Sequence, residues 1–232
     1  MYDKPIIYPG GIITLNDCFI YITVDPSGGG DPDKATARTD MAGWCVAAVT
    51  VSNDWLILEL KKEHMSDAMF VDKLFELNSK YLPRTIGIEK TPHLKAYLDL
   101  QCRIRKQGLP LMELIHKGRP KQVRIRAVRP FLPTTYFPLV ESGHIQKTFH
   151  NWYTDMEHGD DDLDAFAYLP DIAIAPTETQ LRYHREVIKQ RVQEILLEGM
   201  AGDKSELEFM KKLINKDKLD PTTDMENFWK GQ

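Results

Sequence analysis

The sequence predicts an α/β domain built on a mixed β-sheet, with helices on the faces of the sheet and a helical tail at the end of the chain. Two observations predict it. Three β-rich segments come first and are separated only by loops, and after them helical and strand patterns alternate. Three strands in succession indicate an antiparallel meander, and the later alternation indicates parallel strands connected through helices.

The three meander strands are expected at residues 18–24, 44–51 and 55–60, which are rich in β-branched and aromatic side chains. The first ends at Asp25-Pro26, and Asn53-Asp54 joins the other two. Proline and glycine interrupt the residues before them, through Asn16, and this pattern is typical of a linker or lead-in segment.

A helix is expected after Ser66, which can cap its first turn. Its apolar face consists of Phe70, Leu74, Leu77 and Tyr81. A buried strand over residues 84–89 follows, then a helix that starts at Thr91-Pro92 and stops at Gly108, then a strand over residues 111–115. This order of elements is the layout of a ribonuclease H-like core.

From Pro176 the chain becomes strongly charged. The patterns Thr177-x-x-Gln180 and Ser205-x-x-Glu208 fit capping boxes, each of which opens a helix. We therefore predict a ribonuclease H-like domain over residues 1–175 and a charged helical tail over residues 176–232. The tail either packs on the core or docks a partner.

The formal net charge is −4, which by itself argues against a nucleic-acid partner. The distribution of charge argues otherwise, because residues 103–129 contain nine Lys and Arg against a single acidic residue, Glu113. No apolar run approaches the ~20 residues that cross a bilayer, so no membrane association is expected.

Carboxylates stand at the ends of several predicted elements. Asp25 closes the first strand, Glu89 closes the fourth, and the acidic run 160–164 opens an apolar helix. Strand ends at one edge of a sheet converge, and clustered carboxylates repel one another unless they share a cation. Mg²⁺ or Mn²⁺ suits an all-oxygen ligand set, and a pair of such ions can hydrolyse a phosphodiester. Each acid alone could be a turn former or a helix cap.

In this order, the acidic motifs resemble those of the nuclease domain of tailed-bacteriophage large terminases. The motifs are strand-Asp25-Pro26, strand-Glu89 and Asp160-Asp161-x-x-Asp164-Ala165-x-Ala167-Tyr168. The segment Lys121-x-x-Arg124-Ile125, followed by Pro130 and Gly143-His144-Ile145, is similar to the family's stretch before the last motif. The match covers roughly residues 19–169. Asp162 is a departure, because the family more often has an apolar residue there.

The resemblance implies an endonuclease that cuts concatemeric double-stranded viral DNA during genome packaging, in the host cytoplasm. It implies two divalent ions, Mg²⁺ or Mn²⁺, with Asp25, Glu89 and Asp161 as catalytic metal ligands. Asp160 is the next candidate metal ligand. Holliday-junction resolvases share the Asp161-x-x-Asp164-Ala165 arrangement, so Asp164 is a possible extra ligand.

The implied partners are the ATPase motor portion of the same protein, the portal and the small terminase. This chain has no phosphate-binding loop of the form G-x-x-x-x-G-K-[S/T], so we expect no ATPase activity from it. It resembles the C-terminal nuclease portion of a larger motor-nuclease protein.

Lys121, Arg124 and Arg129 are candidate contacts to DNA phosphates, and a solvated helix face is the alternative. We also expect the carboxylates to face no strongly basic counterpart on their own loops. Two other functions remain open. One is a Holliday-junction-type, structure-selective nuclease on the same fold. The other is a non-catalytic DNA-binding or capsid-docking module in which the acids serve only as caps.

Overall fold

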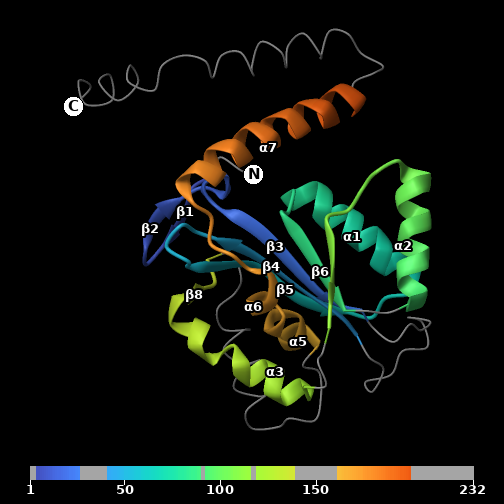
Figure 1. Cartoon of the computed structure of the whole chain (residues 1–232), viewed down its shortest axis with the longest axis horizontal. Helices are drawn as coiled ribbons and strands as arrows, with labels where there is room; N and C mark the ends of the chain where they lie inside the picture. The colour runs from blue at the N-terminus through green and yellow to red at the C-terminus, as the bar shows by residue number, and fades with distance from the viewer. Residues whose placement is uncertain (1–3, 27–40, 90–91, 116–118, 139–160, 200–232) are drawn as a thin grey trace. The chain divides into compact units, whose positions relative to one another are not determined.

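A mixed sheet of six strands forms the centre of the fold (Figure 1). The strands, in sequence order, are β3 (Phe19–Asp25), β4 (Ala42–Val49), β5 (Trp55–Glu63), β6 (Thr85–Glu89), β7 (Leu111–Leu114) and β8 (Thr135–Tyr136). Their order in the sheet is β7-β6-β3-β4-β5-β8. Strand β4 is antiparallel to β3 and β5, whereas β6 is parallel to β3 and β7 is parallel to β6. The predicted fold class, a mixed sheet in which an antiparallel three-strand meander is followed by parallel strands, is therefore confirmed.

The structure is a computed structural model, which describes residues 4–26, 41–89, 92–115, 119–138 and 161–199. The chain divides into two compact units, Met1–Arg182 and Tyr183–Gln232. The boundary falls within helix α7 (Glu178–Gly199), and the predicted division after residue 175 stays a prediction.

In the described ranges, no helix combines the length and the apolar character needed to span a bilayer.

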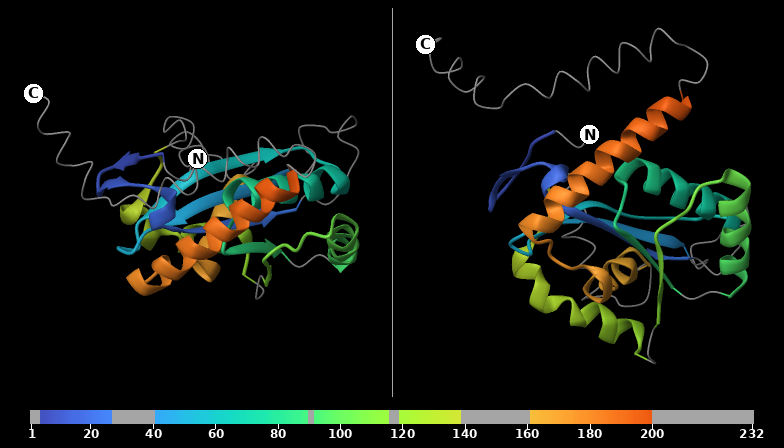
Figure 2. Two further views of the ribbon diagram at one scale, coloured as in Figure 1. Left: turned by 90° about the horizontal axis from the view of Figure 1, so that it is seen from above. Right: turned by 45° about the horizontal axis from the view of Figure 1, so that its top comes forward.

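Helices cover both faces of the sheet. One group consists of α1 (Asp67–Tyr81) and α2 (Pro92–Arg105). The other consists of α3 (Lys121–Ala127), the 3-10 helix η3 (Arg129–Thr134), α5 (Asp161–Ala167) and α6 (Leu169–Ile172). Figures 1 and 2 show the first group lying apart from the second. We call the two faces of the sheet the α1 face and the α5 face.

Strand β3 contributes alternate side chains to the two faces, as the twofold period of a strand requires. Ile20 and Ile22 belong to the core of the α1 face, together with Phe70 of α1. Phe19 and Tyr21 belong to the core of the α5 face. The almost wholly apolar sequence of β3 follows from this burial on both sides.

Two helix starts form as the sequence predicts. The hydroxyl of Ser66 accepts the backbone N–H of Met69 at 3.3 Å and caps α1. At the start of α7, the backbone N–H of Thr177 donates to Oε1 of Gln180 at 2.9 Å, and the backbone N–H of Gln180 donates to Oγ1 of Thr177 at 3.3 Å. This is the expected capping box. The second tail helix, expected after Ser205, lies outside the described residues.

Of the two alternatives predicted for the residues through Asn16, a linker or a lead-in, the linker is wrong. These residues form a hairpin of β1 (Ile6–Tyr8) and β2 (Gly11–Ile13), followed by the 3-10 helix η1 (Leu15–Asp17). The buried side chain of Leu15 fixes the segment to the core of the α1 face. The prolines and glycines that suggested a linker lie beside two very short strands and in the turn between them. Gly11 has a φ of 133° at this turn.

Helix α5 approaches the sheet so closely that its backbone contacts strand β4. A Cβ atom added to Gly43 would lie 2.2 Å from the carbonyl oxygen of Asp161 and 2.5 Å from its carbonyl carbon. Gly43 is the residue of β4 paired with Asp25 of β3. The absence of a side chain at Gly43 therefore allows the start of α5 to lie beside the end of β3.

We expect Gly43→Ala to lower the free energy of unfolding by about 1–3 kcal/mol, as overpacking a core does, because the new methyl group meets backbone rather than movable side chains. Gly87→Ala is the matched control within the same sheet. Its added Cβ would meet side-chain carbons of Leu114 at 3.0 Å and Ile172 at 3.2 Å, which can shift. Urea denaturation of both variants measures the difference. If Gly43→Ala lowers the free energy of unfolding by no more than Gly87→Ala does, α5 can move away from β4 at little cost.

Candidate active site

The ends of β3 and β6 place two carboxylates side by side in the sheet. Val24 of β3 is the register partner of Ile88 in the parallel strand β6, so Asp25 and Glu89 are the next residues along each strand. Val24 and Ile88 face the α1 core. By alternation, Asp25 and Glu89 both face α5.

Helix α5 brings further carboxylates to the same place. Asp161 and Asp164 are three residues apart, which puts them on one side of the helix. Oδ2 of Asp161 accepts the backbone N–H of Met41, which immediately precedes β4, at 3.3 Å. Only 3% of the Asp164 side chain is exposed.

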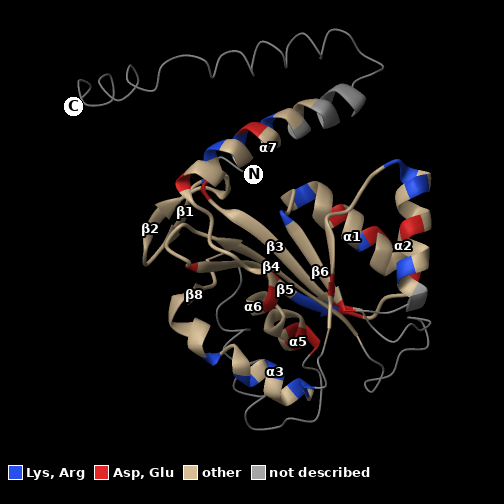
Figure 3. Ribbon diagram, viewed as in Figure 1, with Lys and Arg blue, Asp and Glu red and all other residues tan. Residues whose placement is uncertain are grey.

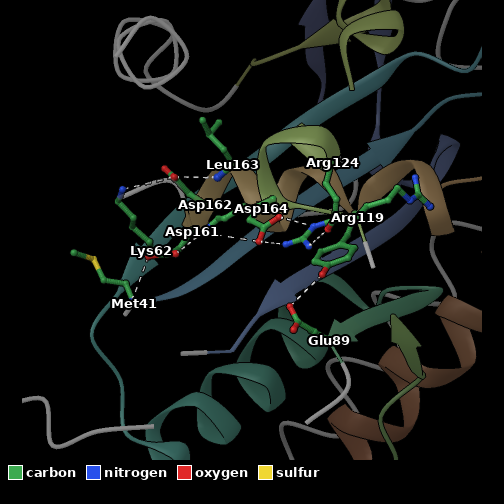
Figure 4. Close-up of polar contacts among 11 residues, drawn as sticks. Met41, Lys62, Glu89, Arg119, Arg124, Asp161, Asp162, Leu163 and Asp164 are labelled. Carbon is green, nitrogen blue, oxygen red and sulfur yellow. Dashed lines mark hydrogen bonds and ion pairs between the residues drawn. The ribbon is translucent and has the colours of Figure 1, made fainter. Parts of the chain in front are cut away.

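Asp162 points elsewhere (Figure 4). Its carboxylate lies 3.7 Å from Nζ of Lys62 on β5 and accepts the backbone N–H of Leu163 at 3.0 Å. Its charge also raises the pKa of the Cys45 thiol, secondary to burial. The sequence left open which member of the acidic run belongs to the site. The structure directs Asp161 and Asp164 to it and turns Asp162 toward β4 and β5.

The carboxyl group of Asp25 is surrounded by like charges. Burial first, and then the charges of Asp164, Glu89 and Asp161, raise its pKa to about 8 against the opposing effect of Lys121. Four carboxylates from β3, β6 and α5 therefore interact at one position. Such a group gains stability from any cation that enters it.

Helix α3 carries basic residues and lies next to the acidic residues of α5 (Figure 3), and two of its cations contact these acids. Nζ of Lys121 lies 2.8 Å from Oδ1 of Asp161 and 3.9 Å from Oδ2 of Asp164. Arg124 binds Asp164 with two hydrogen bonds, Nε to Oδ1 at 3.0 Å and Nη2 to Oδ2 at 2.5 Å. The acids thus have a basic counterpart, although it comes from another helix and not from their own loops.

Apolar contacts hold α3 where its cations reach α5. Ile125 and Val128 are buried in the core of the α5 face. In the following η3, the ring of Phe131 stacks on Trp55 of β5 with the ring centroids 4.7 Å apart. Lys121 and Arg124 are one turn apart and face α5, whereas Arg129 is exposed.

Tyr168 connects Glu89 to the cations. Its hydroxyl donates to Oε2 of Glu89 at 3.1 Å, and its ring lies 5.1 Å from the guanidinium of Arg124. Burial and the charge of Glu89 raise the pKa of Tyr168, so this phenol stays a hydrogen-bond donor. The contribution of Tyr168 was not recognised from the sequence, although the residue is part of the third acidic motif. Its spacing from Asp164 was the available signal.

Not every predicted site residue can be placed. Asp160 lies outside the described residues, and so does the segment with Gly143-His144-Ile145. Within the described ranges, no three Asp, Glu, His or Cys side chains already stand in the arrangement that would hold a metal ion. Lys121 and Arg124 occupy the oxygens of Asp161 and Asp164 instead. The metal-ligand set of Asp25, Glu89, Asp160, Asp161 and Asp164 stays a prediction.

Comparison with known proteins gives structural likenesses only. No family model matches the sequence, and no curated protein matches it significantly. Among solved structures, the Holliday junction resolvase of fowlpox virus is 14% identical, with a TM-score of 0.40 over 66% of this chain and 100% of that one. RuvC of T. thermophilus, solved in complex with a Holliday junction substrate, is 12% identical, with a TM-score of 0.37 over 68% of this chain and 100% of that one.

We expect Asp25→Asn to stabilise the metal-free protein by an amount that grows as the pH rises from about 4 to about 8. The folded protein holds the Asp25 proton up to about pH 8. An unfolded chain releases it near pH 4, so the wild type loses stability through this interval. Because asparagine cannot ionise, Asp25→Asn does not lose stability through this interval. Melting temperatures of both proteins at pH 5 and pH 8, with a chelator present, measure the effect.

The control is Asp171→Asn, which removes an exposed carboxylate from the same compact unit, Met1–Arg182. It tests whether the loss of any carboxylate gives a stabilisation that grows with pH. A constant difference between Asp25→Asn and the wild type across the interval would contradict the crowding of charges at Asp25.

Proposed function

We propose that this chain is a metal-dependent endonuclease that hydrolyses phosphodiester bonds in DNA. The observation that carries the proposal is the position of Asp25, whose carboxyl group interacts with those of Glu89, Asp161 and Asp164. These acids come from three elements that meet on one face of the sheet. A purely structural role as caps or turn formers would not require them to converge, since convergence costs stability.

The donor set suits Mg²⁺ or Mn²⁺, because it consists of carboxylate oxygens without thiolate or imidazole ligands. Asp25, Glu89 and Asp161 would hold two ions, with Asp164 and the undescribed Asp160 as further candidates. When bound, such ions neutralise the charge that develops on a phosphodiester and lower the pKa of a water nucleophile. Tyr168 keeps one oxygen of Glu89 directed toward α6.

The three predicted DNA contacts differ in their surroundings. The side chain of Arg124 is only 10% exposed and binds Asp164 with two hydrogen bonds, so we infer that it positions this acid. Arg129 is exposed and can contact phosphates directly. Lys121 is 32% exposed and lies between these extremes. Contacts of this kind would position the duplex without selecting a sequence.

Two DNA substrates are to be distinguished. The order of the acidic motifs, together with the Lys121-x-x-Arg124-Ile125 segment, favours a terminase nuclease that cuts concatemeric viral DNA. Such a protein would act with an ATPase motor, a portal and a small terminase. The Asp161-x-x-Asp164-Ala165 arrangement, which Holliday-junction resolvases share, equally favours a nuclease of Holliday junctions. One structural neighbour above is named as such a resolvase, and the other was solved with a Holliday junction substrate.

We expect cleavage of plasmid DNA in Mg²⁺ or Mn²⁺, with greater activity in Mn²⁺, and none in excess chelator. Mg²⁺ demands near-octahedral geometry and releases water reluctantly. Mn²⁺ binds nitrogen and oxygen sites somewhat more tightly and should therefore occupy an imperfectly assembled site better. Parallel assays on linear duplexes and four-way junctions of the same sequence separate the two substrates. Cleavage that persists in chelator would contradict the proposal, and DNA binding without cleavage in either metal would favour the non-catalytic module.

Adjacent residues of α5 provide a matched pair of variants. Asp161→Asn should reduce cleavage by more than the roughly 10–100-fold typical of changes behind a metal ligand. Asp162→Asn should retain cleavage but lower the free energy of unfolding by about 1–3 kcal/mol, because the buried Asp162 interacts with Lys62. If instead Asp162→Asn loses cleavage and Asp161→Asn retains it, the site contains Asp162 and not Asp161.

A further inference from the structure

Lys121 places a cation among the carboxylates that are proposed to bind metal. Its ammonium group hydrogen-bonds Oδ1 of Asp161 at 2.8 Å and lies 3.9 Å from Oδ2 of Asp164. The same charge acts on Asp25. The other oxygen of Asp161 accepts the backbone N–H of Met41. Both oxygens of Asp161 are thus engaged by the protein itself.

Lys121 is held less firmly than Arg124. Arg124 makes two hydrogen bonds to Asp164 and one to the carbonyl oxygen of Arg119, lies over the ring of Tyr168, and is 10% exposed. Lys121 stands at the first residue of α3 with a flexible stem, and its side chain is 32% exposed. A lysine ammonium is a compact point charge on a flexible stem, whereas a bidentate arginine is fixed by its planar geometry. Lys121 is therefore the cation that can leave.

A carboxylate oxygen can accept a hydrogen bond and coordinate a metal ion at once, but an ammonium group and a divalent ion at the same oxygen of Asp161 repel each other. A metal ion that coordinates Oδ1 therefore competes with Lys121, and the ammonium group is then better placed against another anion. The phosphates of DNA supply one at the place where the substrate has to bind.

We propose that Lys121 is a built-in competitor of the divalent ion. Without DNA it holds Asp161 and neutralises the acidic site. When DNA binds, a phosphate takes the ammonium group and frees Asp161 for the metal. Metal and DNA then bind cooperatively, each increasing affinity for the other by the same factor. This inference rests on the proposed nuclease function, because it assumes that Asp161 is a metal ligand.

The test is a calorimetric titration of the full chain with Mn²⁺, first without DNA and then with a short duplex. Without DNA, Lys121→Met should bind Mn²⁺ about fivefold more tightly than the wild type, or more, at the lower end of measured couplings between sites. Lys121→Arg, which keeps the charge, should remain close to the wild type. Arg126→Met removes an exposed cation from the same helix and should change nothing.

With the duplex, the wild type should gain Mn²⁺ affinity and Lys121→Met should gain much less. Cleavage during the titration does not remove the probe, since the products retain their phosphates. Unchanged or weaker Mn²⁺ binding by Lys121→Met without DNA would overturn the competitor role. In that case the proposed metal site would still stand, provided that the wild type binds Mn²⁺ and Asp25→Asn does not. If no protein binds Mn²⁺ with or without DNA, the proposed function falls as well.

Discussion

The contact between the backbone of α5 and strand β4 at Gly43 determines the geometry of the whole acidic site. Gly43 pairs with Asp25 on one side and lies against the carbonyl group of Asp161 on the other. Any side chain at this position would push the helix away and carry Asp161 with it. Helix α3 packs in turn on the same core as α5, so its cations depend on the same contact. One residue without a side chain thus allows three elements to meet.

The assembled site has to be stable before any ligand arrives. Four carboxylates on one face repel one another, and the protein offsets this repulsion in two ways. Arg124 is locked between Asp164 and Tyr168, where it fixes geometry as well as charge. Lys121 compensates charge from a more exposed position, with 32% of its side chain exposed against 10% for Arg124. Even with both cations present, burial and the remaining repulsion keep Asp25 protonated up to about pH 8.

The sequence was sufficient for the parts of the fold that depend on local pattern. Strand composition and helix caps predicted the sheet and the starts of α1 and α7. The convergence of strand ends predicted that Asp25 and Glu89 lie side by side, as the pairing of β3 with β6 places them. The β1-β2 hairpin was missed, since its strands are too short to show alternation and are interrupted by turn residues. Local pattern cannot provide what depends on packing between distant elements.

The acidic run illustrates this limit. Helical spacing groups Asp161 with Asp164 and separates both from Asp162, but it does not say which side of α5 faces the site. The contact of α5 with β4 and the ion pair of Asp162 with Lys62 decide that. In the same way, the partners of Lys121 and Arg124 lie 40 residues further along the chain. The ring of Tyr168 could be recognised as apolar from the sequence, but the contact of its hydroxyl with Glu89 could not.

The alternation of side chains along β3 and β6 also constrains how this protein can vary in length. Asp25 and Glu89 face α5 only because each follows a residue that faces α1. A single codon inserted or deleted within either strand would turn its terminal carboxylate to the opposite face and leave the rest of the fold with a shifted register. Substitutions of one buried apolar residue for another preserve that parity. Among relatives that share the activity, these two strands should therefore differ in composition but not in length, and differences in length should collect in the loops.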